Sequence, residues 1–384
     1  MTLAIADKWI WDFWLARDGQ EWHAYFLQAD KSLGDAELRH RNVTLGHAVS
    51  RDLTNWRQLG TCFGPSQGPA WDDWTTWTGS VLRGPDGIWH LFYTGTQRAG
   101  DGLHQRIGHA TSSDMSSWQR VGDGLALDLS GSQYEEYTPG HWPDRAMRDP
   151  WVIRDPQGQG WLMYFTARVP GIAEANAGGA IGLATSPDLF NWTLQPPVYR
   201  GGMFGQMEVP QVMQINGRWY CLFCTWAHHW SSAYRAFNPQ APVGGTHYLI
   251  ADDPRGPWQV APGPFLDGEE PVARYAGRLV QSDDGLKLLG FLHTTPEQPF
   301  VGEVSDPIPV SVDSEGLLAI QARVLAPSRK GELGMVPGKR CLIEPVARAG
   351  VLPISALVTL DTDQDCERWF LAHARYPVVS AALV

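Results

Sequence analysis

An eleven-residue pattern recurs along the chain and constrains its fold more than any other feature of the sequence. It reads Gly-His-Ala-x-Ser-x-Asp-Leu-x-x-Trp at Gly46–Trp56 and returns in close variants at Gly108–Trp118 and Gly182–Trp192. A degenerate copy ends at Trp258, so that successive tryptophans lie 62, 74 and 66 residues apart. Each copy is typical of a strand, a tight turn closed by Ser and Asp side chains, and a second strand.

Two further elements accompany the copies. Short runs rich in aromatic residues come before them, as at Trp22–Gln28 and Trp161–Ala167, and their two apolar faces are typical of a strand between packed sheets. Another strand precedes each run, and these first strands begin near Trp9, Trp77, Asp149, Glu208 and Arg274. Five units of four strands predict an all-β chain that forms a five-bladed β-propeller. A β-sandwich does not explain why three different elements return in the same order.

The blades are complete by about residue 312, so we expect a catalytic propeller domain over residues 1–312. Residues 313–384 then form a short C-terminal β-rich extension, in which Leu342–Val346 and Ala356–Leu360 are strand-like. We expect this extension to be a reduced β-sandwich or a set of packing strands.

Charge and composition exclude several classes of partner. The net charge of −11 disfavours nucleic acid and anionic lipid, and no apolar stretch approaches the ~20 residues of a membrane helix. Met1–Lys8 lacks the basic and apolar regions of a secretory signal, and the five cysteines are widely spread. We therefore expect a cytoplasmic protein with no nucleic-acid or membrane partner, and the oligomeric state stays open.

Tryptophan is unusually frequent, with 19 in 384 residues. Its flat apolar face and single donor suit stacking on sugar rings, although large β-rich cores also use many aromatic residues. The count alone leaves both interpretations open, and a small carbohydrate is the partner that it favours.

Acidic residues stand at the start of three of the expected first strands, at Asp12, Asp149 and Glu208. The first strand of each propeller blade lines the central channel, so we expect these side chains at equivalent positions around it. A carboxylate in apolar surroundings is costly to desolvate unless it has a partner or a task. Three carboxylates in an aromatic funnel fit glycoside cleavage, which needs an acid, a nucleophile or base, and a group that holds the sugar.

Four motifs resemble, in order and spacing, those of the clan that holds invertases, inulinases and levansucrases. They are Trp9-Ile-Trp-Asp12, Trp77-Thr-Gly-Ser80, Arg148-Asp-Pro150 and Glu208-Val-Pro210, and the resemblance covers roughly residues 9–312. It implies a five-bladed propeller and a retaining enzyme for β-fructofuranosidic bonds, in sucrose, fructo-oligosaccharides or fructans.

The resemblance also implies roles for individual residues. Asp12 would be the nucleophile, Glu208 the general acid and base, and Asp149 the stabiliser of the transition state. The implied substrate-binding residues are Trp11, Gln28, Trp77, Ser80, Arg148 and Tyr275. We expect no cofactor and no metal. Cys221 and Cys224 form a Cys-x-x-Cys pair, which could suggest a metal site. Positions i and i+3 of a strand face opposite sides, so the two thiols cannot readily bind one metal ion.

The motifs mix two branches of that clan. Trp11 before Asp12 and Phe13-Trp14 after it look like the levansucrase branch, whereas the Gly-His-Ala repeats look like the invertase branch. Val209 stands where invertases often have a cysteine. The exact sugar and the balance between hydrolysis and fructosyl transfer therefore stay open.

Two other functions remain as alternatives. One is an inverting enzyme of the arabinanase or xylosidase type, and the other is a non-catalytic sugar-binding propeller. Arg148 directly before Asp149 favours the fructosidase, and the presence of all three acids disfavours a lectin.

In a retaining enzyme, we expect a raised pKa for Glu208 and a pKa for Asp12 held low by nearby donors.

Overall fold

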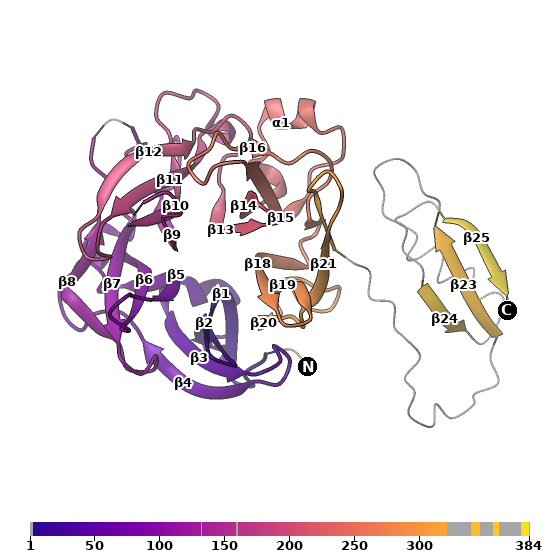
Figure 1. Ribbon diagram of the computed structural model, residues 1–384, viewed down its shortest axis with the longest axis horizontal. Helices are drawn as coiled ribbons and strands as arrows, with labels where there is room; N and C mark the ends of the chain where they lie inside the picture. The colour runs from indigo at the N-terminus through magenta and orange to yellow at the C-terminus, as the bar shows by residue number, and fades with distance from the viewer. Residues whose placement is uncertain are drawn as a thin grey trace. The chain divides into compact units, whose positions relative to one another are not determined.

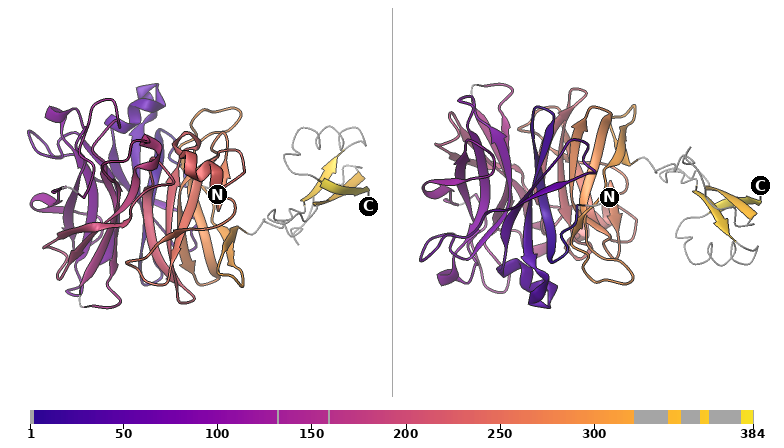
Figure 2. Two further views of the ribbon diagram at one scale, coloured as in Figure 1. Left: turned by 90° about the horizontal axis from the view of Figure 1, so that it is seen from above. Right: turned by 90° about the horizontal axis from the view of Figure 1, so that it is seen from below.

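Residues 8–320 form five antiparallel sheets that stand in a ring, as the computed structural model shows in Figure 1. The structure describes residues 3–131, 133–158 and 160–320, and the backbone of strands 339–345, 356–360 and 378–383. Viewed from the side, the strands of each sheet run along the axis of the ring (Figure 2). This is the five-bladed β-propeller that the repeats predict, and the predicted fold class is confirmed.

Each blade is a meander of neighbouring strands whose first strand lies innermost. The first two blades contain β1 (Lys8–Asp18), β2 (Glu21–Asp30), β3 (Thr44–Ser50) and β4 (Arg57–Phe63), then β5 (Thr75–Arg83), β6 (Trp89–Thr96), β7 (Arg106–Ser112) and β8 (Gln119–Leu127). The third contains β9 (Met147–Arg154), β10 (Trp161–Arg168), β11 (Gly179–Ser186) and β12 (Thr193–Tyr199).

The last two blades carry additional short strands. The fourth contains β13 (Glu208–Ile215), β14 (Arg218–Thr225), β15 (Gly244–Ala251), β16 (Gln259–Val260) and β17 (Asp267–Glu269). The fifth contains β18 (Arg274–Ser282), β19 (Gly285–Leu292), β20 (Glu303–Val304), β21 (Ile308–Val312) and β22 (Leu318–Ile320).

Helical segments are short and lie in the connections. They are η1 (Lys31–Leu33), η2 (Ala36–Arg41), η3 (Arg98–Gly100), η4 (Ala175–Ala177), η5 (Ala227–His229) and the helix α1 (Ser232–Phe237). Within the described residues, no helix has the length and apolar character needed to cross a membrane.

The recurring Ser/Asp pattern forms the turn between the third and fourth strands of a blade. In the first blade, Asp52 Oδ1 accepts hydrogen bonds from the backbone N–H groups of Thr54, at 2.9 Å, and Asn55, at 2.7 Å. Trp56 Nε1 then donates to the carbonyl of Leu53 at 3.2 Å, so the tryptophan packs over its own turn. Asp114 and Asp188 form the same turn in the next two blades, as the repeat predicts.

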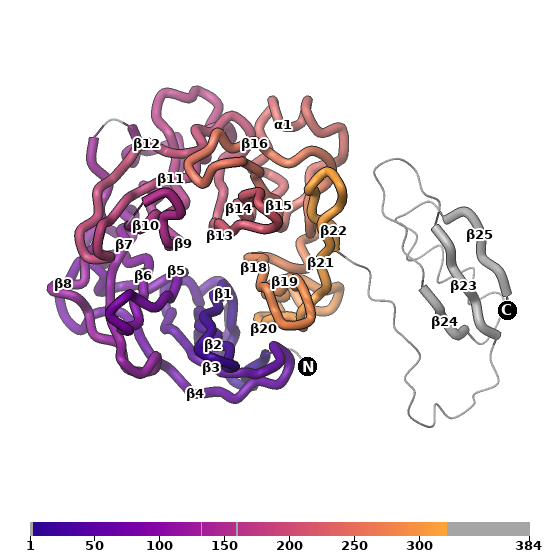
Figure 3. The backbone as a smooth tube through the Cα atoms, viewed as in Figure 1, coloured from indigo at the N-terminus to yellow at the C-terminus, as the bar shows by residue number. Residues whose placement is uncertain are grey.

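The N-terminal segment closes the ring. Leu3 is buried and pairs with Val304 of β20, and each residue donates its N–H to the carbonyl of the other at 3.0 Å. The N–H of Ile10 in β1 also donates to the carbonyl of Gly302 at 3.0 Å. In Figure 3 the first described residues lie beside the fifth blade, and these backbone hydrogen bonds join the first and last blades.

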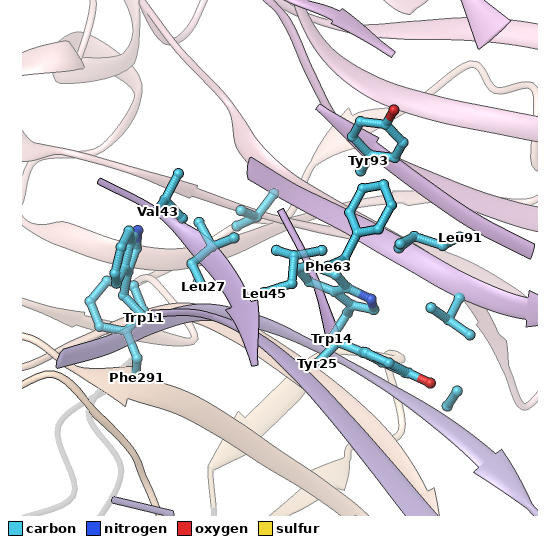
Figure 4. Close-up of a cluster of buried hydrophobic side chains, with 14 of the residues drawn as sticks. Trp11, Trp14, Tyr25, Leu27, Val43, Leu45, Phe63, Leu91, Tyr93 and Phe291 are labelled. Carbon is cyan, nitrogen blue, oxygen red and sulfur yellow. The ribbon is translucent and has the colours of Figure 1, made fainter. Parts of the chain in front are cut away.

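The core lies between neighbouring blades rather than along one sheet face. Between the first two blades, Trp14, Tyr25 and Leu45 pack in one cluster with Leu91 and Tyr93, and all five are fully buried (Figure 4). Burial of each large apolar side chain contributes about 1.5–3 kcal/mol. This packing explains why the aromatic runs are apolar on both faces. Cys221 and Cys224 are buried in two different clusters, as strand alternation predicts.

The first compact unit ends at Ala319 rather than at residue 312, because β22 pairs with β21 as the outer strand of the fifth blade. Residues 320–384 form the second unit, which contains a three-stranded sheet of β24 (Ala356–Leu360), β23 (Lys339–Pro345) and β25 (Val378–Leu383). β23 and β24 coincide with the two strand-like segments of the sequence. The assignment of this extension to a reduced β-sandwich stays a prediction.

Candidate active site

A pocket of about 510 Å³ is lined by residues of all five innermost strands, and we call it the axial pocket. The strand residues that line it are Trp11, Asp12, Trp77, Thr78, Arg148, Asp149, Glu208, Val209 and Tyr275. They come from β1, β5, β9, β13 and β18, so residues more than 260 positions apart in the sequence share one cavity.

A shift of strand register at one point in each innermost strand explains how these side chains reach the pocket. In β1, Trp11 and Phe13 pair with the adjacent residues Leu27 and Phe26, which leaves Asp12 without a partner in the ladder. The register shifts in the same way at Thr78 of β5. Such bulges turn side chains out of the normal alternation, so two successive residues of a strand can face the same cavity.

The other three innermost strands have the same irregularity. The register shifts past Asp149 in β9, Val209 in β13 and Ala276 in β18, and these residues have φ values of 60°, 48° and 50°. Non-glycine residues seldom adopt this left-handed conformation unless the surrounding structure holds them there. The bulge is therefore a repeated feature of the propeller that shapes the floor of the pocket.

The bulges correct one expectation from the sequence. Asp12 and Asp149 occupy the bulged position, as predicted for equivalent sites, but Glu208 lies one residue earlier in its strand. Its structural counterpart in the third blade is Arg148 rather than Asp149. All three carboxylates still line the axial pocket.

Glu208 is held by three donors. Its Oε1 accepts from Arg148 Nη2 at 2.9 Å and from Gln206 Nε2 at 2.6 Å, while its Oε2 accepts from the Tyr275 hydroxyl at 2.6 Å. Burial raises the pKa of Glu208, and the charge of Arg148 opposes this effect. The raised pKa agrees with the direction expected for this residue.

Asp149 is fixed by hydrogen bonds to its own blade and to both neighbouring blades. Its Oδ2 accepts from the Thr166 hydroxyl and from the N–H of Val209, both at 2.9 Å, and its N–H donates to Thr94 Oγ1 at 2.8 Å. Arg148 Nε lies 3.6 Å from the same carboxylate oxygen. Burial raises the pKa of Asp149 despite this cation.

Asp12 departs from the expectation of a low pKa. Its Oδ2 accepts a 2.6 Å hydrogen bond from the Thr78 hydroxyl, but burial and the neighbouring carboxylate of Asp149 raise its pKa from 3.8 to about 7. One hydroxyl donor and the charge of Arg278 are too weak to offset desolvation beside two other acids. The prediction of a low pKa for Asp12 was wrong in direction.

Aromatic side chains form part of the pocket wall, and the predicted residues Trp11, Trp77 and Tyr275 are among them. Trp77 is oriented by its Nε1, which donates to the carbonyl of His40 at 2.9 Å. Tyr275 stacks on Trp226 with 4.7 Å between the ring centroids. These flat faces surround the carboxylates as a sugar-stacking surface would.

Two predicted substrate-binding residues do not line the axial pocket. Gln28 points into its own blade, where its amide donates to the hydroxyls of Thr61 at 2.8 Å and Thr44 at 3.3 Å. Its neighbour Leu27 lines the pocket instead, because successive strand residues face opposite sides. Ser80 is buried two residues beyond the bulge of β5 and also lies away from the pocket lining.

Residues outside the repeats complete the wall. Glu37, Arg39 and His40 come from η2, in the connection between β2 and β3, and further lining residues are Gln105, Asp144, Gln206, Trp226 and His293. The sequence analysis did not predict most of these residues, because the connections between strands do not repeat a pattern from one blade to the next. Gln206 was the exception that spacing could have found, since it stands two residues before Glu208.

Known proteins similar to this chain share its fold and part of its sequence. Invertase of Kluyveromyces lactis is 26% identical over 221 residues, which cover 53% of this chain and 31% of the invertase. Levanase of Bacillus sp. strain L7 is 26% identical over 239 residues, which cover 57% of this chain and 23% of the levanase. The chain thus matches about a third or less of the length of these relatives.

Solved structures show the same propeller. The inulosucrase from Halalkalicoccus jeotgali, bound to kestose, superposes with a TM-score of 0.65 at 21% identity, covering 82% of this chain and 87% of that one. The levansucrase from Gluconacetobacter diazotrophicus gives 0.65 at 17% identity, covering 84% and 82%. At these identities the likeness establishes the fold.

A family model identifies the chain more directly. The model for the N-terminal domain of glycosyl hydrolases family 32 matches residues 14–252, which is more than half of the chain and includes Asp149 and Glu208. Asp12 lies just before the matched segment. On this match, the chain belongs to glycosyl hydrolase family 32.

Proposed function

We propose that this protein is a retaining glycoside hydrolase that cleaves β-fructofuranosidic bonds, with fructosyl transfer as a second outcome of the same intermediate. The observation that carries the proposal is the convergence of Asp12, Asp149 and Glu208 in one aromatic-walled pocket, with Arg148 in contact with Glu208 and near Asp149. Membership of family 32 and relatives named invertase, levanase and levansucrase support it.

The first half of the reaction uses Asp12 and Glu208. The ionised Asp12 carboxylate attacks the anomeric carbon of the fructosyl group, and the bond to the leaving oxygen breaks as Glu208 donates its proton to that oxygen. A fructosyl ester on Asp12 and a free alcohol result. The three donors that hold Glu208 fix the direction from which its proton is delivered.

The second half reverses these roles. Glu208, now a carboxylate, removes a proton from water or from a sugar hydroxyl, and that oxygen displaces Asp12 from the anomeric carbon. Water gives free fructose, and a sugar gives a new fructoside. The donors on Glu208 stabilise its carboxylate in this step, since hydrogen bonds to the charged form favour it.

Asp149 and Arg148 hold the fructosyl group without exchanging protons with it. Arg148 presents donors and Asp149 presents an acceptor to the ring hydroxyls. A carboxylate fixed by Thr166 and by the N–H of Val209 cannot turn away as positive charge develops on the sugar. It therefore stabilises that charge in the transition state.

The decisive experiment incubates the protein with sucrose, inulin, levan and an arabinan, and identifies the released sugar. Release of fructose, lost in Asp12→Ala and in Glu208→Gln, supports the proposal. Release of arabinose instead supports the arabinanase alternative. Sugar binding without turnover, equal in the wild type and Glu208→Gln, supports the non-catalytic propeller.

Stereochemistry separates the retaining and inverting enzymes. We expect NMR of the first-formed sugar, before mutarotation, to show β-fructose from a β-linked substrate, and any transfer product to keep the β configuration. First-formed α-fructose would assign the protein to the inverting class.

A further inference from the structure

A buried arginine outside the axial pocket connects three blades beneath its floor. Arg278 lies in β18 of the fifth blade, is 1% exposed and does not line the pocket. Its Nε donates to the carbonyl of Phe13 in β1 at 3.0 Å. Its Nη1 donates to the carbonyls of Val209, at 2.9 Å, and Pro210, at 3.1 Å, in β13.

The carbonyls that Arg278 binds lie in the bulge of β13 and directly after the bulge of β1. Phe13 follows Asp12 directly, and Val209 follows Glu208 directly. A bulge takes backbone groups out of the ladder, and a buried carbonyl without a partner costs free energy. The planar guanidinium supplies donors in a fixed fork, so it holds both bulges at a set separation. One side chain thus ties down the backbone that presents each of two reacting carboxylates.

The guanidinium also places a positive charge behind Asp12. The ionisable groups that act on Arg278 are Asp149, Cys224, Asp12 and Cys221. Asp12 in turn is influenced by Asp149, Glu208, the Thr78 hydroxyl and Arg278. The charge of Arg278 lowers the pKa of Asp12 and of Asp149, against the raising effect of burial.

Two arginines therefore serve the two sides of the site. Arg148 lines the pocket and contacts the Glu208 side chain directly. Arg278 lies below and reaches the site through backbone carbonyls and through its charge. The principal influences on the pKa of Glu208 are burial, Arg148, Tyr275, Asp149 and Gln206, a set without Arg278.

We propose that Arg278 is a positioning residue of this active site, which locks the bulges next to Asp12 and Glu208 and keeps a cation behind the nucleophile. The inference rests on the proposed function, because it assigns Arg278 a part in the step that Asp12 and Glu208 perform.

The test compares Arg278→Gln, which removes the charge, with Arg278→Lys, which keeps the charge but loses the fork. For Arg278→Gln we expect kcat to fall on the order of 100-fold with little change in KM. The acid limb of the pH profile of kcat/KM should move to higher pH by roughly one unit, because the loss of a neighbouring cation raises the pKa of Asp12. The alkaline limb, set by Glu208, should stay in place.

For Arg278→Lys we expect kcat to fall about 10-fold while both pH limbs stay near those of the wild type. The matched control is Arg120→Lys. Arg120 also holds a carbonyl, that of Gly64 at 2.7 Å, and contacts Asp72, but it lies away from the axial pocket. This control should lower the melting temperature without changing the pH profile.

Wild-type kcat and pH limbs in both Arg278 variants, with only a lower melting temperature, would make Arg278 purely structural and overturn the inference. If Arg278→Gln is not recovered folded, Arg278→Lys decides, since a kcat equal to that of the wild type refutes positioning. A wild-type protein inactive on every β-fructoside would instead refute the proposed function, and the role of Arg278 with it.

Discussion

Asp12 is a residue whose chemistry opposes the stability of the fold. In the folded protein the Asp12 carboxyl keeps its proton up to about pH 7, whereas in the unfolded chain it releases the proton near the ordinary pKa of 3.8. Stability that depends on the protonated form is therefore lost as the pH rises between these two values. A buried nucleophile that must be ionised to act is a cost to the fold at neutral pH.

We expect Asp12→Asn to remove this cost. An asparagine cannot ionise and can still accept the hydrogen bond from Thr78. Its melting temperature should match that of the wild type near pH 4 and exceed it near pH 8, while activity is abolished. Thermal unfolding at the two pH values tests this, and an equal difference at both would contradict the role of the carboxylate charge.

Tyr275 gives a second prediction for a single residue. Its hydroxyl lowers the pKa of Glu208, so Tyr275→Phe should raise that pKa and move the alkaline limb of kcat/KM to higher pH. The rate should fall because Glu208 loses an orienting partner. Tyr220→Phe is the control, since its hydroxyl bonds the distant carbonyl of Gly316. An unmoved alkaline limb in Tyr275→Phe would argue against Glu208 as the acid.

Sequence motifs located seven of the nine pocket residues on the innermost strands, but they did not predict the protonation of Asp12. Trp11, Trp77, Arg148 and Tyr275 all line the pocket, and each stands directly before the bulge of its strand. Gln28 was misplaced because its motif ends one residue past the pocket-facing Leu27. The raised pKa of Asp12 depends on burial beside acids from other blades, which no local motif records.

Among the structural elements, the bulged innermost strand determines the shape of the site. In β5 the bulge brings Gly79 so close to β6 that a Cβ atom on it would lie 1.9 Å from the carbonyl oxygen of Phe92. This contact involves backbone and cannot be relieved by a rotamer change. The glycine of the Trp-Thr-Gly-Ser motif is thus required by strand packing.

We expect Gly79→Ala to destabilise the protein by about 1–3 kcal/mol through overpacking and to raise KM by displacing Trp77 and Thr78. Gly100→Ala is the control, because a Cβ there has no atom within 4 Å. Urea denaturation and steady-state kinetics measure both effects. A Gly79→Ala protein as stable as the wild type would contradict the close approach of β5 and β6.

The repeats predicted the blades because each copy forms the same turn and strand in a different sheet. They did not predict the bulges, since Asp12, Thr78, Asp149, Val209 and Ala276 share no chemical character that a pattern could detect. The contribution of η2 was also hidden, because the connections between the second and third strands of the blades differ in length and in sequence.

For the whole molecule, stability depends on the junction between the first and last blades. Leu3 is 2% exposed, and Leu3→Ala should cost about 2–5 kcal/mol, as for other buried leucines. Leu59→Ala, at a position that is 39% exposed, should change stability by less than about 0.5 kcal/mol. Denaturation midpoints compare the two, and similar losses would mean that the junction contributes little.

The number of repeats predicts a ring of five blades, but it does not predict which segments join the first blade to the last. The pairing of Leu3 with Val304 is an isolated bridge, too short to produce a periodic pattern. The end of the first unit at Ala319 was likewise not visible, because β22 is a three-residue strand.

The five-strand construction of the pocket has a consequence for biosynthesis. Residues from Trp11 to Tyr275 must all be in place before the cavity exists, and the last blade is joined by hydrogen bonds to a segment that precedes the first blade in the sequence. Pairing over such sequence distances is slow compared with the formation of local hairpins. During refolding, we therefore expect enzyme activity to appear in a single late phase, after most of the spectroscopic signal of the β-strands has returned. The appearance of activity then reports the time at which the ring closes.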